Sequence, residues 1–342
     1  MYKPLPGNDL KITVIGGGTG SFTMLGALKH YSHSIAAIVN MADDGGSTGI
    51  LRDELGTLPP GDVRQCLVAL SDSSKMRDLF NYRFEEGTFQ GHAFGNLLLS
   101  ALEKMTGSFS EAVETASDIL RIRGVVIPAT LDNVRLEMHW PSQKDSLLSG
   151  EAVIDAESFE HDPRKATLTL VPNATANPMA IAAIAQADVV VISPGDLYTS
   201  LGPLLVIDGF KDALTTTRAL KIYVSNLVAK KGQTESLTVA DHADEIERFV
   251  GGAFLDYVLY NEQIPTPEII KRYEAEGAHL VSFERDEFKK RHFSAVGGNF
   301  LGQLATPHKN DKLPVMRSLI RHDAPAVARA IIELYNDAHV GR

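Results

Sequence analysis

The chain has 342 residues, of which 44% are hydrophobic and 22% charged, and its formal net charge is -10. This composition supports a large core and excludes bulk disorder, and the acidic balance disfavours broad electrostatic binding to nucleic acid or an anionic membrane. The single cysteine, Cys66, excludes an internal disulfide, and no apolar run reaches the roughly 20 residues that span a bilayer. Because the N-terminal stretch is polar and unlike a signal peptide, we expect a cytoplasmic protein that binds neither nucleic acid nor membrane.

The first part of the chain alternates between short apolar runs and segments with helical spacing. The apolar runs predict strands at 11–15, 35–40 and 125–127. The helical spacing predicts helices at 22–30, 62–70, 96–105 and 111–121. This alternation is typical of a parallel α/β sheet.

Between residues 134 and 171 the apolar pattern changes from continuous runs to strict alternation. Val134, Leu136 and Met138 are separated by polar residues, and 167–171 alternates in the same way. Alternation of this kind predicts antiparallel strands with one face toward solvent, and we expect a hairpin and loops over 143–165. We interpret residues 134–171 as an antiparallel β insertion or subdomain within a single α/β domain that spans 1–342.

The last part of the chain returns to the first pattern. Strands are predicted at 188–192, 220–224, 257–260 and 279–281, followed by an amphipathic helix at 323–335. The whole pattern predicts a doubly wound, mainly parallel, Rossmann-like sheet with a small antiparallel insertion.

A glycine-rich turn follows the first predicted strand and consists of Gly16, Gly17, Gly18, Thr19 and Gly20. Such a turn exposes backbone N–H groups, and the helix that follows presents its N-terminus to an anion. The turn is a poor dinucleotide fingerprint because Ser21 holds the third glycine position, which disfavours a dinucleotide site but leaves it open. It also lacks the lysine of a Walker loop. We predict that it binds phosphate; the alternative is a tight strand-to-helix turn without a ligand.

A second turn, after the second predicted strand, contains Asp43, Asp44, Gly45 and Gly46. Because the carboxyl ends of adjacent parallel strands meet at one edge of the sheet, we expect this turn beside the first. Asp43 and Asp44 are candidates to bind Mg²⁺, to meet a ribose or to act as a base. The alternatives are an Asx turn closed by its own side chains and pairing of one carboxylate with Arg52.

A third turn, after the strand at 188–192, contains Pro194, Gly195, Asp196, Tyr198, Thr199 and Ser200. It also follows a buried strand and opens a helix, so its hydroxyl and backbone N–H groups form a second candidate anion site. The alternative is simple helix capping by Asp196 or Thr199.

Three other side chains are candidates for the same site. Arg64, one turn into a helix, would bind phosphate or pair with a carboxylate. His92 and Asn96 are four residues apart at a helix start, so they share one face and would contact a nucleotide or serve in acid–base chemistry. The alternative for His92 is a purely structural histidine.

Several segments, taken together and in order, resemble one known family over nearly the whole chain. They are Ile15–Ser21 (IGGGTGS), Ala42–Gly49 (ADDGGSTG), Leu58–Arg64 (LPPGDVR), Gly91–Leu97 (GHAFGNL), Pro194–Ser200 (PGDLYTS) and Arg321–Asp323 (RHD). In these segments the chain resembles the YvcK/CofD family, which implies a CofD-like α/β domain.

The family has two branches with different implied functions. One transfers a phospholactyl-type group from a guanosine diphosphate-linked donor to a deazaflavin and uses Mg²⁺. The other, the gluconeogenesis-factor branch, binds UDP-N-acetylglucosamine and is linked to cell shape and envelope precursor supply. The chain resembles the second branch more, but Asp196, Gly202 and the segment 227–234 depart from its pattern, which affects contacts to a sugar more than contacts to phosphates.

The resemblance leads to a first hypothesis of a nucleotide-sugar-binding regulatory factor. The turns at 16–20 and 194–200 would hold a diphosphate, and Asp43 or Asp44 would meet the ribose, the sugar or a metal. Asn96 and Arg321 would orient the nucleotide or sugar. Binding would require no cofactor, although Mg²⁺ remains an option, and we expect a regulatory protein partner and a homodimer.

A second hypothesis is a Mg²⁺-dependent transferase of the phospholactate type, which acts on a nucleoside diphosphate-linked substrate with Asp43 and Asp44 in catalytic roles. A third, an NAD-dependent oxidoreductase, rests on the glycine turn alone and lacks an acidic partner for the ribose, because the second strand ends at Asn40.

Overall fold

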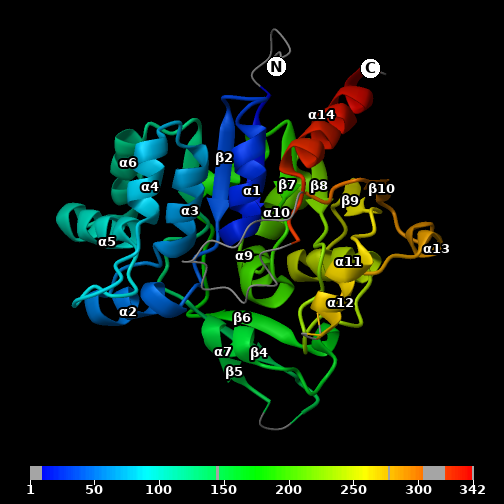
Figure 1. The fold of residues 1–342 in the computed structure, drawn as a ribbon, viewed down its shortest axis with the longest axis horizontal. Coiled ribbons are helices and arrows are strands. Elements are labelled where there is room, and N and C mark those ends of the chain that lie inside the picture. The colour runs from blue at the N-terminus through cyan, green and yellow to red at the C-terminus, as the bar shows by residue number, and fades with distance from the viewer. Residues whose placement is uncertain (1–9, 144–145, 276–277, 303–319, 341–342) are drawn as a thin grey trace.

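The structure is a computed structural model and describes residues 10–143, 146–275, 278–302 and 320–340. Within these residues the main sheet has the strand order β10-β9-β8-β7-β1-β2-β3, and all neighbouring strands are parallel (Figure 1). The strands are β1 (Ile12–Gly16), β2 (Ile35–Val39), β3 (Val125–Pro128), β7 (Val189–Ile192), β8 (Leu220–Val224), β9 (Tyr257–Asn261) and β10 (Ser294–Gly298). The predicted doubly wound sheet is therefore confirmed.

Side chains of each strand alternate between two helical layers, as β1 illustrates. Ile12 and Val14 pack into one apolar core, whereas Ile15 packs into the other. Thr13 points to the second side as well, where its hydroxyl donates to the carbonyl oxygen of Ala183, 3.0 Å away. Because both faces of the sheet are covered, its strands are continuous apolar runs in the sequence.

The helices divide between these two layers. The layer that packs on Ile12 and Val14 contains α1 (Gly18–Leu28), α3 (Gly61–Leu70), α4 (Ser74–Asn81), α5 (Phe94–Thr106), α6 (Phe109–Leu120) and α14 (Ala324–Val340). The opposite layer contains α8 (Pro178–Gln186), α9 (Gly202–Leu205), α10 (Phe210–Thr216) and α11 (Val239–Val250). The shorter or more peripheral helices are α2 (Gly46–Leu55), α12 (Pro267–Ala275) and α13 (Arg285–Phe288).

The predicted antiparallel insertion is present and lies at the bottom of the view in Figure 1, below α2 and α12. Its strands β4 (Arg135–His139), β5 (Leu148–Ser149) and β6 (Thr167–Val171) pair in the order β5-β4-β6. β4 and β5 form an antiparallel hairpin, but β4 lies before the stretch 143–165 in which the hairpin was expected. The rest of that stretch, expected as loops, contains α7 (Glu151–Ala156) and the 3₁₀ turn η1 (Pro163–Lys165).

One predicted strand is wrong. Residues 279–281 contribute only an isolated antiparallel bridge between Leu280 and Val228, and the last strand of the sheet is β10. The sequence of β10, Ser-Ala-Val-Gly-Gly, has one large apolar side chain and lies at the edge of the sheet, half-buried. An edge strand needs less apolar surface than a central one, so it gives a weaker sequence signal.

The strand order places a topological switch point between β1 and β7. The chain runs outward from β1 through β2 to β3 and then returns to the other side of β1 at β7. Ligands of doubly wound proteins bind in the crevice at such a point, beyond the carboxyl ends of the strands. Among the described residues, no helix has the length and apolar character that would let it cross a membrane.

Candidate ligand-binding site at the switch point of the sheet

The turns that follow β1 and β7 pack directly against each other at the switch point. A Cβ atom on Gly20 would lie 1.7 Å from the carbonyl oxygen of Pro194, and one on Gly16 would lie 2.1 Å from Oγ of Ser193. The hydroxyls of Ser21 and Ser193 lie 2.9 Å apart in a hydrogen bond. Close packing between the two turns therefore requires glycine at positions 16 and 20.

The remaining residues of the glycine turn open α1 toward a cavity. Gly17 is the N-cap residue, and Gly18, with a φ of +58°, begins the helix. Its N–H group donates to the carboxylate of Asp62. The first turn of a helix has no intrahelical partner for its N–H groups. Thr19 and Gly20 belong to this first turn and line the cavity, so the positive end of the α1 dipole faces it.

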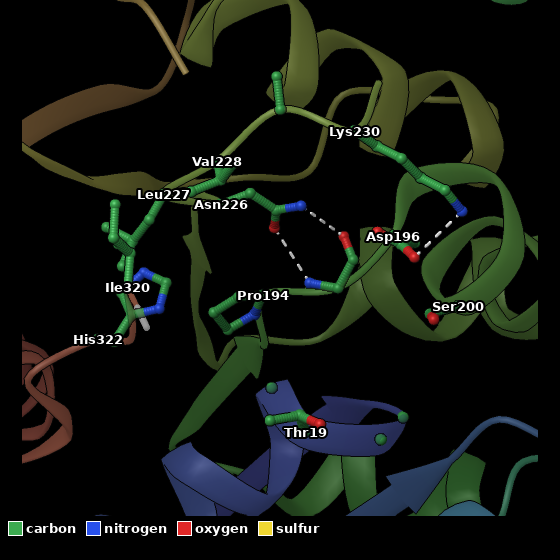
Figure 2. Close-up of a pocket in the computed structure, with 15 residues that line it drawn as sticks. Thr19, Pro194, Asp196, Ser200, Asn226, Leu227, Val228, Lys230, Ile320 and His322 are labelled. Carbon is green, nitrogen blue, oxygen red and sulfur yellow. Dashed lines mark hydrogen bonds and ion pairs between the residues drawn. The ribbon is translucent and has the colours of Figure 1, made fainter. Parts of the chain in front are cut away.

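The cavity has a volume of about 300 Å³. Its lining comes from the turns after β1, β7 and β8 and from the segment before α14: Gly17, Gly18, Thr19, Gly20, Pro194, Gly195, Asp196, Ser200, Asn226, Leu227, Val228, Ala229, Lys230, Ile320 and His322 (Figure 2). Asn226 fixes the third turn, because its side-chain amide accepts from the Gly195 N–H group at 3.1 Å and donates to the Gly195 carbonyl at 2.8 Å.

His322 contributes a neutral imidazole to this lining. Its Nε2 donates to the carbonyl oxygen of Ser225 at 3.0 Å. Burial disfavours the charged ring and lowers the pKa of His322 to about 4. The ring is therefore uncharged near neutral pH, and its Nδ1 is an acceptor for an N–H or O–H group.

An acidic group lies next to the glycine turn, on the side of β2 and α3. A Cβ atom on Gly17 would lie 2.2 Å from Oδ2 of Asp62, so this carboxylate touches the turn. Asp43 and Glu151 interact with Asp62 electrostatically. Burial, reinforced by Asp43, raises the pKa of Asp62 to about 7, and burial raises the pKa of Glu151 to about 9. Burial also raises the pKa of Asp43. The three carboxyl groups therefore keep their protons to a higher pH than isolated carboxyl groups do.

The two carboxylates of the second turn have different surroundings. Asp43 closes an Asx turn, because its Oδ1 accepts from the Gly45 N–H group at 3.0 Å. Asp44 instead holds the insertion: its Oδ1 accepts from the Ala152 N–H group at 2.8 Å, and its Oδ2 lies 3.3 Å from Arg135. Within the described residues, no three His, Cys, Asp or Glu side chains form a group suited to a metal ion.

His92, Asn96 and Arg64 form a buried network behind the second turn. His92 Nδ1 and Asn96 Nδ2 both contact the hydroxyl of Ser47, at 2.9 and 3.3 Å. His92 lies before the N-cap of α5, so the two residues meet at Ser47 and do not share a helix face as predicted. The guanidinium of Arg64 donates to Oδ1 of Asn96 at 2.9 Å and to Asn81. Burial lowers the pKa of Arg64 to about 10. Arg64 thus bonds two amides rather than a carboxylate, and the network does not line the cavity.

The other predicted site residues divide between core and surface. Tyr198 is fully buried, and its hydroxyl donates to Glu245 at 3.0 Å. Thr199 is buried, with its hydroxyl 3.4 Å from Asp155. Arg321 is exposed and stands between Ile320 and His322, which line the cavity. Gly46, with a φ of +46°, begins α2, and Gly45 is its N-cap residue.

Sequence reasoning missed part of this site. Asn226 and Lys230 follow β8, so the rule that placed the other turns at the carboxyl ends of strands would have identified them. The sequence around Asp62 indicates only a helix cap. Glu151 and Asp155 lie on α7, and no sequence signal shows that this helix folds over the acidic turn.

The fold and cavity together define a class of protein. It is a doubly wound α/β protein with a cavity at the switch point of its parallel sheet, the place where such folds bind their ligands.

Comparison with known proteins identifies the family. Residues 12–301 match the model of the 2-phospho-L-lactate transferase CofD family, and the chain belongs to this family. The gluconeogenesis factor of Bacillus subtilis is 37% identical over 334 residues, which cover 97% of this chain and 100% of that protein. The gluconeogenesis factor of Listeria monocytogenes is 36% identical over 327 residues, which cover 95% of each chain. A crystal structure of protein BH3568 from Bacillus halodurans has a TM-score of 0.85, 33% identity, and covers 95% of this chain and 100% of that one.

Proposed function

We propose that this protein binds a nucleotide sugar, UDP-N-acetylglucosamine, and acts as a regulatory factor linked to cell shape and envelope precursor supply. The observation that carries the proposal is the cavity at the switch point. The N-terminus of α1 lines one side of this cavity, and the third turn lines another. The family supports it, because the relatives at 36–37% identity are named gluconeogenesis factors.

The chemistry of the lining suits such a ligand. The N–H groups of Thr19 and Gly20 would receive the diphosphate, favoured by the dipole of α1. Ser200 offers a hydroxyl donor, and the neutral His322 offers an acceptor for a hydroxyl or imide N–H group of the ligand. Regulation requires only that the ligand shift the population of a conformation that a protein partner recognises.

The test is a calorimetric titration with UDP-N-acetylglucosamine, GDP and NAD, each with and without Mg²⁺. We expect the uridine sugar to bind without Mg²⁺ and more tightly than the other two. Ser200→Ala should weaken binding, whereas Ser110→Ala, on α6, should not. If the uridine sugar does not bind, the proposal is wrong.

A second candidate function is Mg²⁺-dependent group transfer from a nucleoside diphosphate-linked donor. The observation that favours it is a pair of interacting, half-buried carboxylates, Asp43 and Asp62, of which Asp62 touches Gly17. Their oxygen donors suit a hard cation, and they would hold Mg²⁺ in place of the pair Asp43 and Asp44, because Asp44 already binds Arg135 and the start of α7. Bound Mg²⁺ would neutralise charge on a diphosphate leaving group.

This candidate requires product formation that depends on Mg²⁺ and is lost in the Asp62→Asn variant. The control is Glu86→Gln, which removes an exposed carboxylate on the loop between α4 and α5 and should retain product formation. Tight binding of the donor without turnover, across a range of acceptors, would argue against it.

A further inference from the structure

One charged side chain of the cavity has no part in the arrangement above. Lys230 follows β8 and has 9% of its side-chain surface exposed. Among the described residues that line the cavity, it is the only lysine or arginine, and Asp196 is the only acid. Figure 2 shows Lys230 and Thr19 on different sides of the cavity, with the ammonium directed toward Asp196.

Two other elements hold this ammonium in position. Lys230 Nζ forms an ion pair with Asp155 of α7 and lies 3.3 Å from Oδ2 of Asp196 in the third turn. Its backbone N–H group donates to the hydroxyl of Thr234 at 2.8 Å, which fixes the segment that carries it. The insertion, the turn after β7 and the segment after β8 therefore meet at this one side chain.

Asp196 and Lys230 both line the cavity, and they form an ion pair with each other at its wall.

The energetics of the pair suggest a role. A buried ammonium is costly unless an anion compensates it, and two carboxylates do so here. Both carboxylates keep contact with water, since 41% of the Asp155 side chain and 29% of the Asp196 side chain are exposed. An exposed carboxylate is released at low cost, so a phosphate group of higher charge can replace it next to the ammonium.

We propose that Lys230 is a phosphate-binding residue of this cavity, and that a phosphate group of the ligand replaces Asp196 as its partner while Asp155 keeps the ammonium in place. The inference rests on the proposed function and deepens it. The ligand class is a diphosphate that spans the cavity from the α1 N-terminus to Lys230. Asp196 competes with the ligand, which favours phosphate groups over weaker anions.

The experiment measures the affinity of the full chain for UDP-N-acetylglucosamine, inorganic pyrophosphate and uridine. Lys230→Gln should weaken binding of the first two by about 10- to 100-fold, the effect of losing a charge-assisted hydrogen bond, and should leave any binding of uridine unchanged. Lys231→Gln, at the exposed neighbouring lysine, is the matched control and should match the wild type. Asp196→Asn should strengthen binding several-fold, because the competing charge is gone.

Each outcome decides a separate point. If Lys230→Gln binds both phosphate ligands as the wild type does, Lys230 is not a phosphate-binding residue. If Asp196→Asn weakens binding, Asp196 does not compete with the ligand. If the wild type binds pyrophosphate through Lys230 but does not bind the uridine sugar, the nucleotide-sugar proposal fails and the role of Lys230 stands. If the wild type binds neither, both proposals fail.

Thermal unfolding monitored by circular dichroism checks that the variants are folded. If Lys230→Gln does not fold, Lys230→Arg and Asp196→Asn decide the question. Lys230→Arg keeps the charge and should retain binding to within several-fold, and a complete loss there would contradict the proposal.

Discussion

Asp62→Asn tests the electrostatics of the acidic group beside the glycine turn. Asp62 is half-buried, and desolvation together with Asp43 raises its pKa from 3.8 to about 7. The folded protein therefore keeps this proton to a higher pH than the unfolded chain does. The free energy of unfolding therefore falls as the pH rises from about 4 to about 7, because ionised Asp62 is unfavourable in the folded protein. Above this range the full destabilisation by ionised Asp62 is present.

The magnitude follows from the shift. One pKa unit corresponds to about 1.4 kcal/mol, so a shift of about three units corresponds to about 4 kcal/mol. The amide introduced by Asp62→Asn does not ionise, and its oxygen can still accept from the Gly18 N–H group. The variant should therefore gain stability relative to the wild type by a few kcal/mol between about pH 4 and about pH 8.

The assay is urea unfolding followed by circular dichroism near pH 4 and near pH 8, with EDTA present. The informative quantity is the difference in the free energy of unfolding between variant and wild type, because His322 changes the stability of both proteins with pH. The pKa of His322 is lowered to about 4, so stability from this residue is lost as the pH falls from about 6.5 toward 4. This pH dependence is opposite in sign to that of Asp62. Glu86→Gln, an exposed carboxylate, serves as the control. A variant-minus-wild-type difference that is the same at both pH values would refute the reasoning.

Three other substitutions test local parts of the account. Asp44→Ala removes the acceptor for the Ala152 N–H group and the partner of Arg135, so urea unfolding should show a loss of about 1–2 kcal/mol, while calorimetry should show ligand affinity within about twofold of the wild type. Gly20→Ala forces a Cβ atom against the Pro194 carbonyl and should lower the free energy of unfolding by about 2 kcal/mol or more. Gly26→Ala lies in the same helix with no atom within 4 Å of its new Cβ, and it should raise the free energy of unfolding by up to about 1 kcal/mol. Equal melting temperatures of the two variants would contradict this contrast. Tyr198→Phe removes the hydrogen bond to Glu245 and should cost about 1 kcal/mol without a change in ligand affinity, and a large loss of affinity would place Tyr198 in the site after all.

The sheet was predictable because its strands are buried on both faces. Continuous apolar runs such as 188–192 have few alternative structures, and the glycine turns after them mark the carboxyl edge of the sheet. β10 escaped prediction because an edge strand with two glycines carries little apolar signal. α7 escaped because its six residues lie in a polar stretch and it is held by Asp44, a contact between residues more than 100 positions apart.

The site was predictable where it depends on backbone and not where it depends on side-chain partners. The turns after β1 and β7 converge as expected, because parallel strands bring their carboxyl ends together. Chain position does not reveal that Asp44 turns toward Arg135, that Arg64 binds two amides, or that Tyr198 is enclosed by the core. Those outcomes are set by which side chain can satisfy a buried polar group, and that depends on the packed fold.

The most direct test of the central claim is a crystal structure of the protein soaked with UDP-N-acetylglucosamine. We predict that the diphosphate lies in the cavity, within hydrogen-bond distance of the N–H groups of Thr19 and Gly20 at the start of α1. A diphosphate bound elsewhere, or a cavity that stays empty at saturating ligand, would contradict the account.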